Sequence, residues 1–406
     1  MMDIEKKTPF KAKGTLFETF IPDNLSHRDD QMMMLTNILT NLLHTGQSSN
    51  IFCYGKTGTG KTVTTRYTAD RIRFEGMKQN KNTTVVYTPA VEGTELDLYA
   101  HIGNETAGKN IIPSRGLSTQ ETYNRTKDIL DSRNTRAIVI MEEIDKFYEK
   151  NGDDFLYQLS RINPQLKYSS LCLIGIANNL KFTEHFDPRV ISSLNKEDII
   201  FPPYNALQLQ DILKQRAKIA FKTHAIEDGI INLCAALSAR EHGDARRAIE
   251  LLRAAGEIAE REGEEVVKIE HMKKAQNKIE LDNVEEVIKT LPVQSKLILA
   301  SIVFSSERGK NTLITGEVYD IYKDMAKKTG IDIITQRRAT DLISELDMLG
   351  IINARLISYG RGGRTRVITP AISIPDTKEL LLQDDSLSSL KDYKTPHPGR
   401  PRKGFF

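Results

Sequence analysis

The sequence contains no tryptophan, few cysteines and no long apolar run, and each absence narrows the class of protein that it can encode. Its three cysteines, Cys53, Cys172 and Cys234, are odd in number and far apart, which excludes a disulfide framework or a clustered metal site. The longest nearly apolar run, from Leu297 to Phe304, is far too short to cross a membrane. The charged start MMDIEKKTPFKAKG lacks the apolar stretch of a secretory signal, so we expect a cytoplasmic protein.

The chain is long enough for two or three domains. It has 406 residues, 39% of them hydrophobic and 27% charged, and its net charge of +3 does not indicate a partner. Between residues 50 and 201, short β-branched apolar runs alternate with longer segments of helical periodicity. This order predicts a parallel α/β sheet covered by helices on both faces, within a first domain that we assign to residues 1–204.

The strands stop after residue 204, and the rest of the chain follows other patterns. Residues 205–281 have helical periodicity only and predict a helical domain. Residues 282–374 predict three helices and a hairpin around a GRGGR turn, which is the pattern of a winged helix. Residues 375–406 lose periodicity and are rich in Pro, Asp, Ser, Lys and Arg, so we expect a disordered basic tail.

A glycine-rich motif gives the strongest functional signal. Residues 55–62 read GKTGTGKT, directly after the apolar run IFCY and directly before a helical segment. Such a loop aims backbone N–H groups at phosphate oxygens beside a helix N-terminus. We therefore predict a P-loop in which Lys61 contacts the β and γ phosphates of a nucleoside triphosphate and Thr62 contacts Mg²⁺. The nucleotide-binding residues of the loop are predicted to be Gly55, Lys56, Thr57, Gly58, Thr59, Gly60, Lys61, Thr62 and Val63.

A second apolar run, AIVIM, ends in the acids Glu142, Glu143 and Asp145. Parallel sheets bind ligands at the C-terminal ends of their strands, so the acids are expected beside the P-loop. We assign Glu142 to the Mg²⁺ shell together with Thr62, and Glu143 to the base that polarises the attacking water. Asn178, which ends the next apolar run, is a candidate to orient that water.

Taken in order, these motifs resemble AAA+ ATPases of the archaeal origin-recognition family, the replication initiators related to eukaryotic origin-recognition and cell-division-cycle loading factors. The resemblance covers nearly the whole chain and is carried by FIPDNLSHRDDQ, GKTGTGKT, MEEID, GIANN, FDPRVISSL, GDARRAIELL and the C-terminal winged helix. It implies an AAA+ domain closed by a helical lid domain, with ATP or ADP and Mg²⁺ as ligands.

The resemblance also assigns roles to individual residues. Asn178 becomes the sensor amide, Arg189 the arginine finger and Arg246 the second sensor on a lid helix. Read without the family, the two arginines could equally be solvated surface charges. The remaining residues that we assign to the nucleotide site are His27 and Arg28, which would flank adenine, and Tyr204 and Arg216.

One position departs from the family pattern. The family usually has Asp where this chain has Glu142, and the extra methylene moves the carboxylate relative to Mg²⁺. Because Mg²⁺ keeps several waters, we expect an outer-shell contact to preserve binding while hydrolysis is slow. A slow switch suits a protein that needs distinct ATP and ADP states more than rapid turnover.

Arginines fall at both places where a winged helix usually meets DNA. Arg337 and Arg338 open the third predicted helix, and Arg361, Arg364 and Arg366 lie in the hairpin. We expect the helix to enter the major groove and the hairpin to follow the minor groove or the backbone. The alternative is a protein-interaction module with a solvated turn.

Two further segments are candidate DNA contacts. By the resemblance, residues 110–125 are a helical insertion whose turn at Arg115 and Gly116 touches DNA, whereas a plain helical connection is the alternative. The tail holds Gly-Arg-Pro among further basic residues. Arg400 and Arg402 are therefore expected to bind DNA, either as an AT-hook or through nonspecific attraction to phosphates.

Together these features predict an ATP-dependent DNA replication initiator that binds double-stranded origin DNA, associates with the nucleoid and helps load the replicative minichromosome-maintenance helicase. Paralogous initiators are further expected partners, and a membrane is not. Two alternatives stay open, namely an ATP-responsive winged-helix transcription regulator and an AAA+ loader or motor with continuous ATP turnover. Footprints confined to promoters would favour the regulator, and fast DNA-stimulated ATP hydrolysis would favour the motor.

Overall fold

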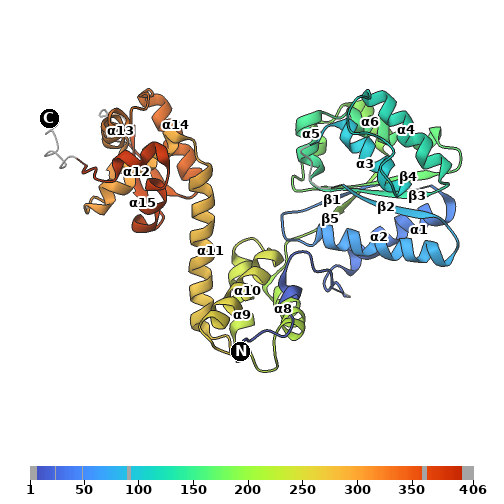
Figure 1. Cartoon of the computed structure of the whole chain (residues 1–406), viewed down its shortest axis with the longest axis horizontal. Coiled ribbons are helices and arrows are strands. Elements are labelled where there is room, and N and C mark those ends of the chain that lie inside the picture. The colour runs from blue at the N-terminus through green and yellow to red at the C-terminus, as the bar shows by residue number, and fades with distance from the viewer. Residues whose placement is uncertain (1–6, 23, 48, 89–92, 359–363, 396–406) are drawn as a thin grey trace, which may run out of the picture. The chain divides into compact units, whose positions relative to one another are not determined.

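The computed structural model describes residues 7–22, 24–47, 49–88, 93–358 and 364–395 (Figure 1). The chain separates into two compact units, Met1–Ala275 and Gln276–Phe406. The first contains the predicted sheet and most of the predicted helical domain, and the second contains the predicted winged helix. No described helix is both long enough and apolar enough to cross a membrane.

A five-stranded parallel sheet forms the centre of the first unit, as predicted. Its strands follow the order β2-β3-β4-β1-β5, and each neighbouring pair runs parallel. Apolar runs form β1 to β4 because helices cover both faces of the sheet. The edge strand β5 differs, since its sequence KEDII is largely polar and mostly exposed. The strands are β1 (Asn50–Tyr54), β2 (Thr83–Thr88), β3 (Arg136–Met141), β4 (Ser170–Ala177) and β5 (Lys196–Ile200).

Two layers of helices enclose this sheet. In Figure 1, α1 and α2 lie on one face and α3 to α6 on the other. This arrangement brings the C-terminal ends of β1, β3 and β4 to one edge, where the P-loop and the acidic motif follow. The helices are α1 (Asp29–Thr45), α2 (Lys61–Lys78), α3 (Glu95–Ala107), α4 (Thr119–Ser132), α5 (Ile144–Asn151), α6 (Asp154–Ser160) and α7 (Pro188–Leu194).

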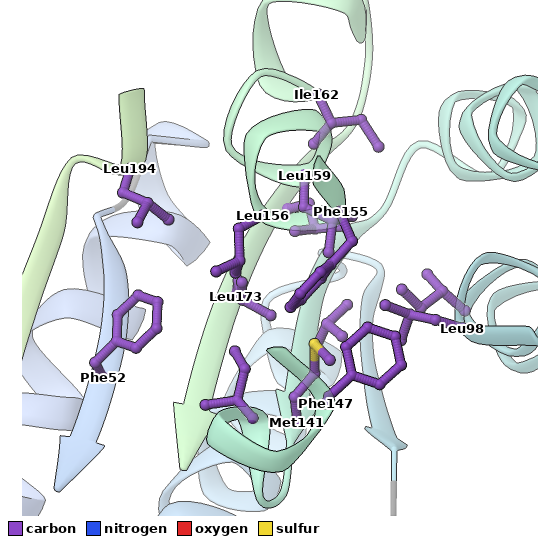
Figure 2. Close-up of a cluster of buried hydrophobic side chains, with 14 of the residues drawn as sticks. Phe52, Leu98, Met141, Phe147, Phe155, Leu156, Leu159, Ile162, Leu173 and Leu194 are labelled. Carbon is purple, nitrogen blue, oxygen red and sulfur yellow. The ribbon is translucent and has the colours of Figure 1, made fainter. Parts of the chain in front are cut away.

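Aromatic side chains fill the core between the sheet and the second layer (Figure 2). Phe52 and Leu173 of the strands are buried in one cluster with Phe147 and Phe155 of α5 and α6. The last two rings meet edge to face, with 4.6 Å between their centroids. Burying a side chain of this size stabilises the fold by about 2 to 3 kcal/mol. The packing therefore holds the strands whose ends carry the candidate site.

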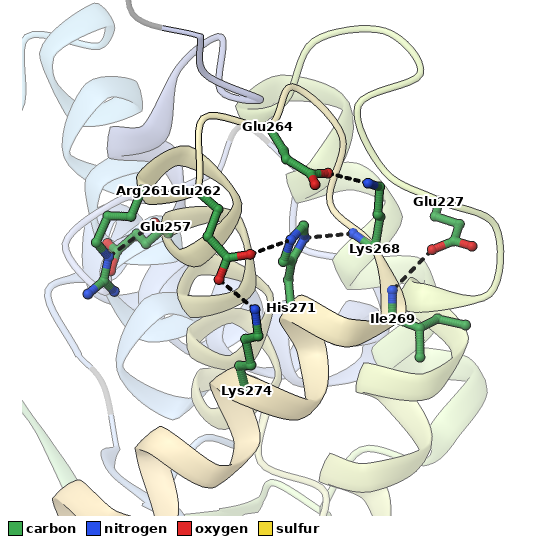
Figure 3. A network of polar contacts seen from close by, with 9 residues as sticks. All are labelled: Glu227, Glu257, Arg261, Glu262, Glu264, Lys268, Ile269, His271 and Lys274. Atoms are coloured by element: carbon green, nitrogen blue, oxygen red, sulfur yellow. Dashed lines mark hydrogen bonds and ion pairs between the residues drawn. The ribbon is translucent and has the colours of Figure 1, made fainter.

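Helices alone build the domain that follows the sheet. Asn205 begins it by capping α8, because its side chain accepts the backbone N–H of Gln208 at 2.9 Å. A polar network fixes the start of α11 (Figure 3), where His271 Nδ1 accepts the N–H of Lys268 at 2.9 Å and Glu262 lies 3.4 Å from His271 Nε2. The helices are α8 (Ala206–Ala220), α9 (Ile230–Arg240), α10 (Ala245–Arg261) and α11 (Ile269–Thr290).

Residues 7–22, here called the N-terminal strap, pack on this helical domain rather than on the sheet. Phe10 packs against Phe221 with 4.8 Å between the centroids of the tilted rings, and the N–H of Lys11 donates to Ala220 O at 2.7 Å. A Cβ on Gly256 of α10 would lie 2.5 Å from Phe10 Cζ, so the close approach needs a glycine. The first domain, assigned to residues 1–204, therefore begins with a segment that packs on the lid.

The second unit is a winged helix, as predicted. Its antiparallel sheet has the strand order β6-β8-β7, in which the two-residue β6 was not evident from the sequence. The boundary predicted between residues 281 and 282 falls inside α11, which is continuous there. The elements are α12 (Val293–Glu307), β6 (Leu313–Ile314), α13 (Thr315–Thr329), α14 (Gln336–Met348), β7 (Ile352–Ser358) and β8 (Arg364–Pro370).

The prediction of a disordered tail from residue 375 is wrong for residues 375–395. They form α15 (Ile374–Leu382) and the 3-10 helix η5 (Asp385–Leu390), which pack on the winged helix. Spaced apolar side chains outweigh the polar composition of this stretch, because they are buried in the core of the second unit. These side chains are Leu381, Leu387, Leu390 and Tyr393. Residues 396–406, with Arg400 and Arg402, lie outside the described part of the chain.

Candidate nucleotide site and nucleic-acid surface

The glycine-rich loop joins β1 to α2 in a conformation suited to phosphate. Gly58 and Gly60 have φ angles of 69° and 86°, in the left-handed region that favours glycine. Gly60 directly precedes α2, so the loop leads into the unpaired N–H groups of a helix N-terminus. A Cβ on Gly60 would also lie 2.6 Å from the hydroxyl of Tyr204, which gives this glycine a second, packing role.

Lys61 is buried under this loop and is held by three oxygens. Its Nζ donates to Gly55 O at 2.6 Å, to Lys56 O at 2.7 Å and to Asn178 Oδ1 at 3.0 Å. Burial, with a smaller contribution from the positive charge of Arg246, lowers the pKa of Lys61 to about 8. Phosphate groups beside the two cations would raise that pKa again, because opposite charge favours the protonated amine.

The two acids that follow β3 are each paired with a cation of the chain. Glu142 accepts a hydrogen bond from Arg66 of α2 at 2.8 Å, and Glu143 lies 2.8 Å from Lys146 Nζ. Both acids line the same cavity as the P-loop. The sequence predicted that Glu142 and Glu143 lie beside the P-loop, but it did not predict their pairing with Arg66 and Lys146. Arg66 belongs to no recognised motif.

The residues present fit Mg²⁺ only together with nucleotide phosphates. Thr62 and Glu142 both line the cavity. In the described part of the chain, no group of three or more His, Cys, Asp or Glu side chains comes together as a ready-made metal site. Since Mg²⁺ keeps several waters and takes phosphate oxygens as ligands, one hydroxyl and one carboxylate are a sufficient protein contribution.

Asp145 fixes the end of β4, a role that the sequence did not assign. Its buried carboxylate accepts the backbone N–H groups of Asn178 at 2.9 Å and Asn179 at 3.0 Å through the same oxygen, Oδ2. These bonds orient Asn178, whose amide oxygen accepts from Lys61. The P-loop lysine, the acidic motif and the predicted sensor amide therefore form one connected network.

The lid docks directly on the P-loop. The N–H of Ala245, the first residue of α10, donates to Gly58 O at 3.1 Å. Asp244 caps this helix by accepting the N–H groups of Arg246 at 2.7 Å and Arg247 at 3.2 Å. A Cβ on Gly58 would lie 1.6 Å from Asp244 Oδ1, so the loop accepts the lid only with glycine at this position. Arg246, at the same helix end, lines the cavity.

The cavity between the loop and the lid has a volume of about 740 Å³, within the range of nucleotide-sized sites. Its polar lining comes from Thr57 to Val63 of the loop with Glu142, Glu143, Asn178 and Arg246. Its apolar lining includes Leu16, Phe17, Phe20 and Ile21 of the N-terminal strap with Ile212, Ile219 and Ile249 of the lid. Both kinds of lining suit a ligand that joins a phosphate chain to a base.

The residues predicted to flank adenine have other contacts. Arg28 is buried and donates to Thr59 O at 2.9 Å and to Pro202 O at 2.7 Å. It therefore links the P-loop to the segment that follows β5. His27 Nε2 lies 3.2 Å from Asp211. Neither residue is among the described residues that line the cavity.

Tyr204 and Arg216 do line the cavity. The guanidinium of Arg28 lies 3.8 Å from the centroid of the Tyr204 ring, a cation–π contact that fixes the ring. Arg216 donates to two carbonyls of the N-terminal strap, Thr15 O at 3.1 Å and Phe20 O at 3.2 Å. These two bonds tie the strap to α8, a contact that the sequence could not indicate, and the assignment of Arg216 to the nucleotide site stays a prediction.

Arg189, the predicted arginine finger, is not among the described residues that line the cavity of its own chain. Its side chain is 82% exposed and forms an ion pair with Asp187 at 2.9 Å. This guanidinium, chiefly through its hydrogen bond, lowers the pKa of Asp187 to about 2. The role assigned to Arg189 stays a prediction.

On the winged helix, α14 presents its N-terminal end to solvent. Thr335 caps it by accepting the N–H of Arg338 at 3.3 Å, as the sequence indicated. Arg337 and Arg338 are exposed, and the latter makes a 3.4 Å contact with Glu345. An exposed, positively charged helix start is the usual surface for a DNA groove. The geometry agrees with the role of these arginines, which stays a prediction.

The hairpin residues have different positions. Arg366 donates to Ser344 Oγ and to Thr340 O of α14, so it links the hairpin to the helix. Arg355 of β7 is exposed and was missed, because it lies outside the GRGGR turn. Arg361 lies outside the described residues, and of Arg364 only the backbone is described.

The connection between α3 and α4 carries the remaining predicted contact. Asn104 fixes its start, because the amide oxygen accepts the N–H groups of Ile111 and Ile112 at 2.8 Å each. Arg115 and Gly116 follow in an exposed turn, where Gly116 has a φ of 90°. Because Arg115 and Gly116 are exposed, the turn is accessible to the DNA contact that was predicted for it.

The fold and the site define the class of this protein. The P-loop, the two acids after β3, the amide of Asn178 and Arg246 of the helical lid line one cavity. This arrangement defines an AAA+ ATPase domain, and a winged helix follows it in the chain. Three family models match the same parts, namely an AAA domain over residues 44–181, a Cdc6 AAA+ ATPase-type lid domain over residues 210–277 and a CDC6 C-terminal winged helix domain over residues 286–379.

Similar proteins cover nearly the whole chain. The ORC1-type DNA replication protein 1 of Methanosarcina mazei is 46% identical over 394 residues, which are 96% of this chain and 94% of that protein. The ORC1-type DNA replication protein of Pyrococcus horikoshii is 49% identical over 88% of this chain and 86% of its own length. A solved structure, the Aeropyrum pernix ORC1 protein in complex with DNA, is 39% identical with a TM-score of 0.79, and the match covers 94% of this chain and 98% of that one. The chain belongs to the family of ORC1-type DNA replication proteins, which confirms the resemblance found in the sequence.

Proposed function

We propose that this replication protein binds ATP with Mg²⁺ in the cavity beside the P-loop and that the bound nucleotide controls its lid. The observation that carries the proposal is the docking of α10 on the loop, where Ala245 donates to Gly58 O at 3.1 Å and Arg246 lines the same cavity. A γ-phosphate beside Arg246 would stabilise the docked lid through charge, and its loss would weaken the docking.

Slow hydrolysis would reset this switch. Glu143 would accept a proton from a water that attacks the γ-phosphorus, while the bond to the bridging oxygen breaks and ADP leaves. Asn178 would orient the water, and Lys61 would neutralise charge on the phosphates. Mg²⁺, held by Thr62 and Glu142, supplies further charge neutralisation when bound. Both acids would exchange their present partners, Arg66 and Lys146, for the metal shell and the water.

Arg189 would complete the site of a second subunit. Because its side chain is 82% exposed and outside its own cavity, it is accessible to a neighbouring copy or a paralogous initiator. A positive charge supplied in this way would act on the phosphates of that neighbour, so hydrolysis would depend on assembly.

The winged helix would bind double-stranded origin DNA. Arg337 and Arg338 at the exposed start of α14 suit the major groove, and Arg355 with the hairpin suits the adjacent minor groove. Arg115 and Gly116 would give the ATPase unit a second contact. The proposal is supported by the Aeropyrum pernix ORC1 protein, which is 39% identical and was solved in complex with DNA.

Origin marking would precede helicase loading. The relatives are ORC1-type DNA replication proteins, so a DNA-bound initiator that recruits the replicative minichromosome-maintenance helicase in the nucleoid is the function that suits the family and this site.

Genome-wide crosslinking and footprinting of the wild type beside Lys61→Ala tests this function. We expect peaks at a few replication start sites that change when Lys61 is lost, and sequence-selective binding to repeated origin elements at physiological salt. Peaks spread over promoters and unrelated to start sites would instead support a transcription regulator.

A further inference from the structure

Arg66 belongs to the nucleotide site although no recognised motif contains it. It lies on α2 four residues after Thr62, so the two side chains project from the same face of the helix. Arg66, Thr62 and Glu142 all line the cavity. The Arg66 guanidinium donates to Glu142 Oε1 at 2.8 Å, so the two side chains form an ion pair.

The Arg66 guanidinium is held in place, but not all of its N–H groups have hydrogen-bond partners among the described residues. It lies 4.9 Å from the centroid of the Tyr87 ring on β2, a cation–π distance. Its Nε is buried and has no hydrogen-bond partner within the described residues. The side chains of Arg66 and Glu142 remain 38% and 24% exposed, so their pairing is weak enough to be reversed by a competitor.

Glu142 is also the carboxylate expected to serve Mg²⁺. The guanidinium orients the carboxylate through Oε1 and places a positive charge beside it. Because like charges repel, that charge opposes a second cation at the same carboxylate. The residue type matters, because Asp would be shorter by one C–C bond, about 1.5 Å, and would leave hydrogen-bond reach of Arg66.

We propose that Arg66 holds Glu142 away from Mg²⁺ and so raises the Mg²⁺ concentration that nucleotide binding requires. The inference rests on the proposed nucleotide site and adds a positioning residue to it. In this account Arg66 and Glu142 form a resting pair that opens only when Mg²⁺ and nucleotide are both abundant, and the pair re-forms when they leave.

The test is a Mg²⁺ titration of the full-length protein with a fluorescent ADP analogue, read as the Mg²⁺ concentration that gives half-maximal binding. In R66Q we expect this concentration to fall about threefold to fivefold, the scale of a part-exposed ion pair. E142D, which no longer reaches Arg66, should lower it similarly. Adding R66Q to E142D should then have no further effect, because the interaction is already absent.

A matched control separates this effect from a general loss of charge. R73Q removes one positive charge from the same helix, where Arg73 pairs with Asp70 at 2.9 Å, and should keep the wild-type Mg²⁺ dependence. An unchanged or raised half-saturating concentration in R66Q would overturn the role of Arg66 while leaving the nucleotide site intact. Failure of the wild type to bind the analogue at any Mg²⁺ concentration would overturn both.

Discussion

The nucleotide site and the winged-helix surface hold their functional side chains in opposite ways. In the former, Lys61 contacts three oxygens and Glu142 and Glu143 are each paired with a cation. In the latter, Arg337 is exposed and Arg338 makes only a 3.4 Å contact. Reaction at a phosphorus atom needs fixed groups, whereas attraction to a phosphate backbone tolerates mobile ones.

This difference determines how much one substitution should cost. A change in the nucleotide site disturbs a connected network and should have a large effect. A change on the winged-helix surface proposed to bind DNA removes one of several similar charges and should have a modest effect.

Lys61→Ala should have the largest effect. The substitution removes the buried cation at the phosphate end of the cavity, and we expect nucleotide affinity to fall at least about 100-fold, as measured by calorimetry. Lys78→Ala, at the exposed end of the same helix, should bind like the wild type. Comparable losses in both variants would contradict a specific role for Lys61.

Gly58→Ala should come next, because it breaks the contact between loop and lid. The new Cβ would lie 1.6 Å from Asp244 Oδ1, so α10 has to move away. We expect a cost of about 2 kcal/mol, or roughly 30-fold in nucleotide affinity, with faster hydrogen exchange at the start of α10.

Gly152→Ala is the matched control for this change. Gly152 has a φ of 77°, and among the described residues beyond its chain neighbours no atom lies within 4 Å of the position that an added methyl group would take. The substitution therefore introduces the backbone strain without the clash. If Gly152→Ala weakened nucleotide binding as much as Gly58→Ala does, the docking of the lid would not be the cause.

Arg337→Ala should have a smaller effect on DNA affinity. Loss of one exposed cation should weaken binding about fivefold to tenfold and reduce the salt slope by about one. Fluorescence anisotropy over a range of salt concentrations measures both. Lys323→Ala on α13, which pairs with Asp320 at 2.8 Å, should leave them unchanged. A loss near 100-fold would show that this surface is as tightly organised as the nucleotide site.

Asp384→Asn should have the smallest effect, confined to the winged-helix unit. Lys296 lies 2.7 Å from Asp384 and, through this hydrogen bond, lowers the pKa of the carboxyl to about 2. The folded pKa is below the ordinary 3.8, so the stabilisation is complete above pH 3.8 and is lost as the pH falls towards 2.

Hydrogen exchange of the full chain can measure this contribution. At neutral pH, the variant should lose about 1 kcal/mol of protection in α12 and η5, and the difference from the wild type should shrink as the pH falls below 3.8. Asp392→Asn, an exposed change in the same stretch, should lose none. Equal protection in all three proteins at neutral pH would contradict the pairing.

The sequence predicted the architecture because local signals agreed with each other. The apolar β-branched runs indicated the strands of a parallel sheet, and the segments of helical periodicity indicated the helices that cover it. The glycine-rich loop directly after a strand fitted the same arrangement, which the structure confirms. The winged helix was predicted for the same reason. The relative order of the motifs along the chain was sufficient to identify the family.

The contacts between distant segments were not predictable. Nothing in the pattern around Arg66 indicates Glu142. Nothing in the strap indicates that it packs on the lid, because its few apolar residues, such as Phe10, carry no periodicity. Residues 375–395 were mistaken for a tail because composition outweighed four spaced apolar side chains. Each of these cases concerns which surface a segment meets, a property that emerges only from tertiary packing.

The most direct test of the account is the affinity of the full-length protein for a duplex of one origin repeat, measured at fixed salt with ADP and with a non-hydrolysable ATP analogue, each with Mg²⁺. The wild type should distinguish the two nucleotides by about fivefold or more, and Arg246→Ala should bind DNA equally well with either. Equal affinities in the wild type, or an undiminished difference in Arg246→Ala, would contradict a nucleotide switch that acts through the lid.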